Sequence, residues 1–140
     1  MRYLIDTCVI SEIVRKAPEK KVVDWIQAQD ESSLFLSVIT IGEIQKGISK
    51  LPEGRRRRRL QSWLGEDLPR RFLGRILEID QEIASRWGMI SGEAESHGAR
   101  IPVLDGLLAA TALETGMILI TRNTAHARAA GAQVLDPWAS

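Results

Sequence analysis

The 140-residue sequence contains a single cysteine, Cys8, so no disulfide can form within the chain. A lone thiol in a short chain is typical of proteins from a reducing compartment. No apolar run approaches the roughly 20 residues that a membrane helix needs. Asp6 interrupts the only apolar stretch near the N-terminus, Tyr3 to Ile5, so we see no signal peptide. We therefore expect a cytoplasmic protein with no membrane segment.

Several site motifs of common α/β proteins are also missing. Neither the dinucleotide-binding pattern G-x-G-x-x-G nor the phosphate-binding pattern G-K-[ST] occurs. A response-regulator receiver would need a lysine after its last strand, and no lysine follows Lys50. A haloacid-dehalogenase-like phosphatase would place a second acid two residues after Asp6, where Cys8 stands. The only histidines, His97 and His126, are too far apart in sequence to suggest a ligand pair.

The charge of the chain is unevenly distributed. Apolar residues make up 44% and charged residues 26% of the sequence, which is typical of a globular protein, and the length favours a single domain over residues 1–140. The net charge is only +1, but ten of the 19 Lys and Arg residues lie between Lys46 and Arg75, where there are three acidic residues. This basic segment is surrounded by a net acidic remainder, so any polyanion is expected to meet one part of the surface.

Short apolar runs alternate with helical patterns along the whole chain. The apolar runs predict strands over residues 2–6, 34–38, 75–79, 117–121 and 133–135. Helices are predicted over residues 7–14, 22–26, 41–51, 55–64, 83–94, 104–115 and 124–130, with Pro69 as a break. Continuous apolar strands that alternate with helices favour a three-layer α/β/α fold with a central, mostly parallel sheet of four to five strands.

Polar oxygens follow three of the predicted strands. Asp6 ends the first strand, Glu43 is expected in the first turn of the helix after the second, and Asn123 comes two residues after the fourth. Asp105 lies in the first turn of the helix predicted at Leu104. Because the carboxyl ends of parallel strands share one edge of the sheet, we expect these groups to lie close together. An acid in a first helical turn can also serve only to stabilise its helix, and that alternative stays open.

A cluster of carboxylates requires a cation to offset its repulsion. Asp6 is the strongest indication, since an aspartate that leaves a buried strand is unfavourable unless it is paired or bound to a metal. Oxygen ligands without histidine or thiolate favour a hard ion such as Mg²⁺ or Mn²⁺ over zinc. Such an ion can activate water for attack on a phosphate.

The sequence resembles PIN-domain toxins of the VapC/FitB type, from type II toxin–antitoxin systems, over nearly its whole length. The matching segments are LIDTCVISE (4–12), LSVITIGEIQKGI (36–48), GRILEID (74–80), IPVLDGLLAATA (101–112), LITRN (119–123) and DPW (136–138). The resemblance implies a PIN-like α/β/α fold, a homodimer, and a Mg²⁺- or Mn²⁺-dependent endoribonuclease that acts as a toxin. It also implies a cognate VapB-like antitoxin whose C-terminal segment wraps the toxin and blocks the site.

The resemblance also implies roles for individual residues. The family's acidic cluster maps onto Asp6, Glu43, Asp105 and Asn123, and accompanying hydroxyl positions map onto Thr7 and Thr121. Metal ligation is expected from Asp6, Glu43 and Asp105, because the fourth position is an amide here. We therefore expect one metal ion, or a second one that binds only with substrate. The family often has asparagine where this chain has Cys8, which we interpret as a small buried residue and not as a catalytic thiol.

The arginine run Arg55–Arg59, together with Arg122, is predicted to contact RNA phosphates. Two other interpretations of the run remain, a contact with the antitoxin or a second copy of the chain, and a plain solvated face. Five consecutive arginines cover every side of a helix, so they cannot all face one groove.

Two alternatives to a ribonuclease remain open. The first is a catalytically weak PIN-fold binding module that works mainly through its antitoxin, which would carry it to operator DNA. The second is a nuclease for single-stranded DNA that uses the same site.

Overall fold

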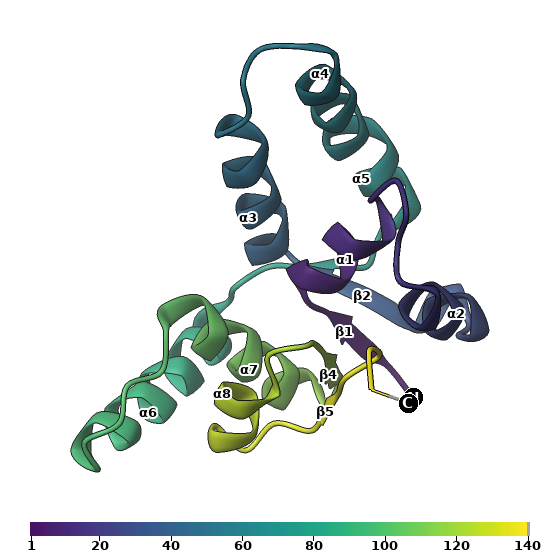
Figure 1. Ribbon diagram of the computed structural model, residues 1–140. Coiled ribbons are helices and arrows are strands. Elements are labelled where there is room, and N and C mark those ends of the chain that lie inside the picture. The colour runs from purple at the N-terminus through teal and green to yellow at the C-terminus, as the bar shows by residue number, and fades with distance from the viewer. Residues whose placement is uncertain (140) are drawn as a thin grey trace.

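The computed structural model describes residues 1–139 and contains a five-stranded sheet in the order β3-β2-β1-β4-β5 (Figure 1). Every pair of neighbouring strands is parallel. The strands are β1 (Tyr3–Ile5), β2 (Leu34–Ser37), β3 (Ile76–Leu77), β4 (Ile118–Ile120) and β5 (Val134–Leu135). The predicted parallel α/β sheet is confirmed, although β3 is shorter than the strand expected over residues 75–79.

Helices cover both faces of the sheet. They are α1 (Thr7–Ile13), α2 (Lys20–Ala28), α3 (Val38–Ser49), α4 (Arg55–Ser62), α5 (Leu68–Arg71), α6 (Gln81–Ser96), α7 (Val103–Thr115) and α8 (Thr124–Ala129). A 3-10 turn, η1 (Glu31–Ser33), precedes β2, and a π turn, η2 (Trp63–Asp67), joins α4 to α5. Among residues 1–139, no helix has the length and apolarity to cross a membrane.

Side chains of the central strands alternate between two apolar cores. Ile5 and Ile120 belong to the core under α1, α2 and α3, whereas Leu4 and Leu119 belong to the core under α7 and α8. This alternation follows from the two-residue period of a strand. Both faces are buried, which is why these strands read as continuous apolar runs in the sequence.

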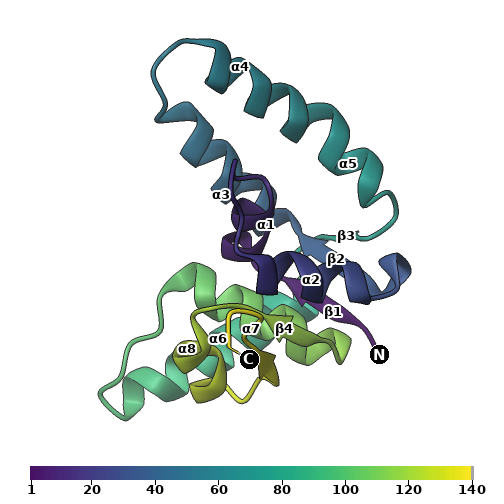
Figure 2. The same ribbon diagram turned by 45° about the vertical axis from the view of Figure 1, so that its right-hand side comes forward.

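The segment from Arg55 to Arg71 is one continuous helical rod, as Figure 2 shows for α4 and α5. The prediction that Pro69 breaks the helix is therefore wrong. The reason lies in η2, where the Leu68 N–H bonds to the carbonyl of Trp63, five residues earlier. This wider π turn lies immediately before the proline, where a regular helix would clash with its ring.

The order of the strands reverses beside β1. From β1 the chain runs outward through β2 and β3, and it then returns to the other side of β1 with β4. In open parallel sheets, sites form beyond the carboxyl ends of the strands at such a reversal. Asp6 and Thr121, which directly follow β1 and β4, lie at this point.

Candidate active site

Asp6 is buried at the junction of β1 and α1, with 8% of its surface exposed. Its Oδ1 accepts the Thr7 N–H at 2.7 Å and caps α1, and its Oδ2 accepts the Thr121 hydroxyl at 2.7 Å. Burial raises the pKa of Asp6, and the charge of Asp105 adds to this, against the lowering effect of these hydrogen bonds. The site therefore holds a carboxylate whose ionised form is unfavourable without a cation.

Thr121 connects this carboxylate to the loop after β4. Its hydroxyl oxygen accepts the Asn123 N–H at 3.0 Å while the hydroxyl donates to Asp6. Its exposed fraction is 1%, so the connection is shielded from water. Asn123 is thereby fixed at the start of α8.

Asp6, Asp105, Thr121 and Asn123 line one small cavity, which is closed by Leu108, Leu119 and Ala127. Its volume is about 10 Å³, room for about one water molecule or ion. Asp105 lies in the first turn of α7, as predicted. Three of the predicted site residues thus meet across the sheet edge, from segments far apart in sequence.

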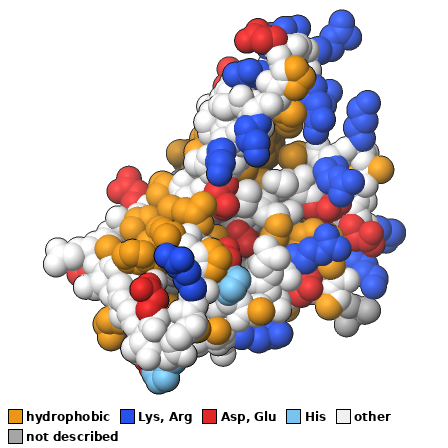
Figure 3. Space-filling model, turned by 60° about the vertical axis from the view of Figure 1, so that its left-hand side comes forward, with side chains coloured by type: hydrophobic (Ala, Val, Ile, Leu, Met, Phe, Trp, Pro, Cys, Tyr) orange, Lys and Arg blue, Asp and Glu red, His pale blue; other side chains and the backbone are white. Residues whose placement is uncertain are grey.

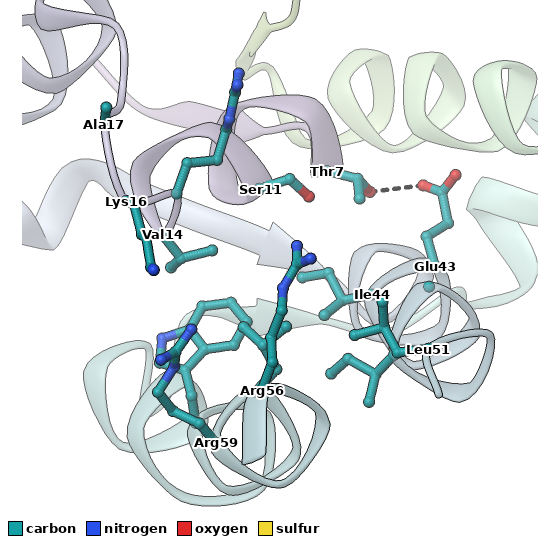
Figure 4. A pocket seen from close by; sticks show the side chains of 15 residues that line it. Thr7, Ser11, Val14, Lys16, Ala17, Glu43, Ile44, Leu51, Arg56 and Arg59 are labelled. Atoms are coloured by element: carbon teal, nitrogen blue, oxygen red, sulfur yellow. Dashed lines mark hydrogen bonds between the residues drawn. The ribbon is translucent and has the colours of Figure 1, made fainter. Parts of the chain in front are cut away.

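Glu43 is placed differently from the prediction. Ser37 caps α3 by accepting the Ile39 N–H at 3.0 Å, so the helix begins at Val38 and Glu43 lies in its second turn. The Thr7 hydroxyl donates to Glu43 Oε1 at 2.6 Å (Figure 4). Thr7 therefore bridges the two acids, because its N–H binds Asp6 and its hydroxyl binds Glu43.

The predicted metal ligands divide into two positions. Asp6 and Asp105 line the small cavity with the amide of Asn123, a set of hard oxygen donors that suits Mg²⁺ or Mn²⁺. Glu43 lies outside that cavity, one hydrogen-bonded residue away from Asp6. Within residues 1–139, no three His, Cys, Asp or Glu side chains are close enough to share one ion. Two carboxylates and one amide are thus the donors that this cavity offers.

Cys8 lies beside the site and is half-buried. Its Sγ is 3.7 Å from Asp6 Oδ2 and 3.8 Å from Thr121 Oγ1, and it accepts the Arg122 N–H at 3.5 Å. Burial, followed by the charge of Asp6, raises the pKa of the Cys8 thiol. A thiol with a raised pKa is a poor nucleophile at neutral pH, which agrees with a packing role.

A large cleft adjoins the site between α1, α3 and α4, with a volume of about 690 Å³. Thr7 and Glu43 lie at one end of it, and basic side chains from α4 and from the loop after α1 line its rim (Figure 4). Sequence reasoning did not predict this cleft. The basic pair Arg15 and Lys16, directly after the first helix, was the available indication of its second wall.

The predicted RNA-binding arginines do not act as one surface. Arg56 and Arg59 line the cleft, and Arg57 donates instead to the carbonyl of Leu51 at 3.0 Å. Arg122 lies elsewhere, with its guanidinium 4.7 Å from the ring centre of Trp138.

Comparison with known proteins agrees with this geometry. The PIN domain family matches residues 3–132. VapC ribonuclease Y4jK of Sinorhizobium fredii is 38% identical over 136 residues, covering 96% of both chains, and toxin FitB of Neisseria gonorrhoeae is 36% identical over 135 residues, covering 96% of this chain and 97% of FitB. A structure of FitAB bound to an IR36 DNA fragment contains a chain with a TM-score of 0.92 and 35% identity, covering 99% of this chain and 96% of that one. The chain therefore belongs to the PIN-domain family, with VapC and FitB toxins among its relatives.

Proposed function

We propose that this protein is a metal-dependent endoribonuclease and the toxin of a toxin–antitoxin pair. The observation that carries the proposal is the cavity at the ends of β1 and β4, where a buried Asp6 with a raised pKa meets Asp105 and Asn123. Such an arrangement is unfavourable as a purely structural feature and gains from a hard cation. The printed names of two relatives, VapC ribonuclease and toxin FitB, support both halves of the proposal.

Asp6 and Asp105 would hold Mg²⁺ or Mn²⁺, with the Asn123 amide oxygen as a neutral third donor. When bound, the cation supplies positive charge against a phosphate and promotes ionisation of water. Thr121 keeps Asp6 and the Asn123 backbone in fixed relation, since its one hydroxyl group bonds to both. Thr7 holds Glu43 at the end of the cleft, where its carboxylate is placed to accept a proton from the attacking water.

The test is cleavage of total bacterial RNA by the purified chain, with Mg²⁺, with Mn²⁺ and with EDTA. Discrete fragments are expected only with metal, and Asp6→Asn and Asp105→Asn should abolish them. Asp136→Asn, at an acid outside the cavity, is the control and should cut like the parent. Matched single-stranded DNA in the same assay separates a ribonuclease from a DNA nuclease. Folded protein that cuts no RNA with any metal would contradict the proposal.

We further propose that an antitoxin occupies and blocks this site in a cytoplasmic complex, and that operator DNA is reached only through that partner. A FitAB structure with DNA supports the second step, since it contains a chain similar over almost the full length. Exposed apolar side chains support a homodimer. Met89 on α6 and Val103 at the start of α7 are 68% and 57% exposed, on helices that pack together, and Figure 3 shows a hydrophobic area on the lower part of the molecule.

A catalytically weak binding module is the second candidate. Asn123 favours it, because an amide at this position leaves the cavity with two carboxylates and less charge to hold a cation. Toxicity in cells separates the two candidates. A toxic parent with a harmless Asp105→Asn variant supports the nuclease, whereas equal toxicity supports the binding module.

A further inference from the structure

The cleft between α1, α3 and α4 has an apolar floor and a basic rim. Aliphatic side chains and Trp63 form the floor, with members from α3 and α4: Ile44, Ile48, Leu51, Leu60 and Trp63. Lys16, Arg56 and Arg59 stand at the rim, and Glu43 is the single acid among the lining residues. Figure 3 shows Lys and Arg side chains gathered over the upper part of the molecule, which α3 and α4 build.

Helical phase sorts the arginine run. Arg56 and Arg59 are three residues apart and share a face of α4, the face that carries Leu60 and Trp63 into the cleft. Arg55 and Arg58 are exposed and do not line the cleft, although they belong to the same helix. The chain thus contains two arginine pairs of equal charge, of which only one faces the site.

The rim cations of the cleft lack acidic partners. Within residues 1–139, no carboxylate lies within ion-pair distance of Lys16, Arg56 or Arg59, whereas Arg15 pairs with Glu12 at 3.1 Å. Cations held together without counter-charges repel one another and attract a polyanion. The apolar floor adds a surface for a base, and RNA-binding proteins read single strands by taking unstacked bases onto such surfaces.

We propose that this cleft binds the single-stranded RNA segment next to the scissile phosphate, with Lys16, Arg56 and Arg59 on its phosphates and an unstacked base on the apolar floor. The inference rests on the proposed function. An acidic peptide would match the same charges, but RNA is favoured because the cleft ends at Thr7 and Glu43. A strand that lies in the cleft brings its phosphodiester to the catalytic carboxylates.

The experiment measures RNA binding without cleavage. A fluorescein-labelled single-stranded RNA of about 12 nucleotides is titrated with protein in EDTA, and anisotropy is followed from low to high KCl. The variants are Arg56→Ala/Arg59→Ala, the charge-matched Arg55→Ala/Arg58→Ala, and Arg56→Lys/Arg59→Lys, with circular dichroism to confirm folding. A fully paired RNA duplex is the second probe.

We expect the cleft pair Arg56→Ala/Arg59→Ala to lower the slope of log K against log salt by about 1.4, because each phosphate contact contributes roughly 0.7 for a single strand. The lysine variant should keep most of the slope, and the control pair should lower it less than half as much as the cleft pair. The parent should bind the single strand at least tenfold more tightly than the duplex. Equal losses from both alanine pairs, or preference for the duplex, would overturn the proposal.

Binding and cleavage can fail separately. An unchanged slope in the cleft pair, with metal-dependent cleavage intact in the parent, refutes the cleft inference alone. Binding through the cleft without cleavage by any variant refutes the proposed nuclease alone. Unchanged RNA binding together with lost binding to a co-expressed antitoxin segment would assign the cleft to a peptide and overturn the proposal.

Discussion

Replacing Asp6 with asparagine is expected to stabilise the metal-free protein and to remove its response to metal. The side chain is 8% exposed, and burial raises its pKa, so the folded chain holds its ionised form at a free-energy cost. Asparagine keeps the oxygen that caps α1 through the Thr7 N–H. The Thr121 hydroxyl can turn to accept from the new amide, so both hydrogen bonds survive without the charge.

The size of the gain follows from what is removed. The hydrogen bonds already offset part of the desolvation, so neutralising the carboxylate should stabilise the fold by about 1 to 2 kcal/mol. For a chain of 140 residues this corresponds to an increase in Tm of about 3 to 7 °C. Excess cation reverses the order, because a ligand at about 100 times its Kd stabilises the parent by about 2.7 kcal/mol and the variant by much less.

The pH dependence has a definite sign. An acid whose pKa is raised on folding destabilises the protein wherever it is ionised in the folded state. Lowering the pH through the raised pKa of Asp6 protonates it in the folded protein, so the parent recovers and its difference from the asparagine variant shrinks. The difference should vanish near the ordinary pKa of aspartate, where Asp6 is protonated in both the folded and the unfolded chain.

Differential scanning calorimetry in EDTA and in Mn²⁺, at several pH values, tests all three expectations. Asp80→Asn is the matched control, because Asp80 caps α6 through the Ile83 N–H at 2.9 Å but is exposed. Aspartate and asparagine cap helices about equally well, so the control should change stability by less than about 0.5 kcal/mol. A lower Tm for the Asp6 variant in EDTA would refute the reasoning, because the hydrogen bonds to the charged form would then outweigh its burial.

Three further substitutions probe the frame around the cavity. Thr121→Val removes the hydroxyl that bonds to Asp6 and to the Asn123 N–H, and should lower the free energy of unfolding in urea by about 1 to 3 kcal/mol, whereas Thr121→Ser should retain most of it. Gly106→Ala places a methyl group 3.0 Å from Trp87 Cδ1, directly after Asp105 in α7, and should destabilise by about 1 to 3 kcal/mol with a change in tryptophan emission; an unchanged unfolding curve would contradict that packing. Asn123→Asp adds a third carboxylate and should lower the Mn²⁺ concentration for half-maximal cleavage; a higher requirement would remove Asn123 from the metal site.

The sheet edge could be predicted from sequence because strand direction decides it. Once the apolar runs are assigned to parallel strands, the residue after each strand must lie at the carboxyl edge, whatever the loops do. This reasoning brought Asp6, Asp105 and Asn123 together, and the structure confirms that they line one cavity. The pattern carries no information about distances, so it could not show that Glu43 lies outside this cavity, attached through Thr7.

The regions that sequence reasoning missed depend on tertiary contacts. Pro69 is an ordinary helix breaker by local rules, yet a π turn before it lets the helix continue to Arg71. Packing of this rod alongside α3 creates the cleft, with Leu60 and Trp63 in its floor. The phase of the arginine run follows from that packing, since a uniform run has no apolar stripe of its own to orient it.

The two threonines that follow β1 and β4 explain why the site keeps its shape with few carboxylates. Thr7 joins Asp6 to Glu43, and Thr121 joins Asp6 to the backbone of Asn123, so each hydroxyl links the central carboxylate to a different loop. A shift of either loop would break a hydrogen bond at a buried charge, which is more costly than breaking one in water. The donors therefore stay in place before any cation arrives, and binding energy need not be spent on ordering them. Such preorganisation is most valuable in a cavity where an amide has replaced one acid, because the weaker field of the donors must then be offset by their fixed geometry.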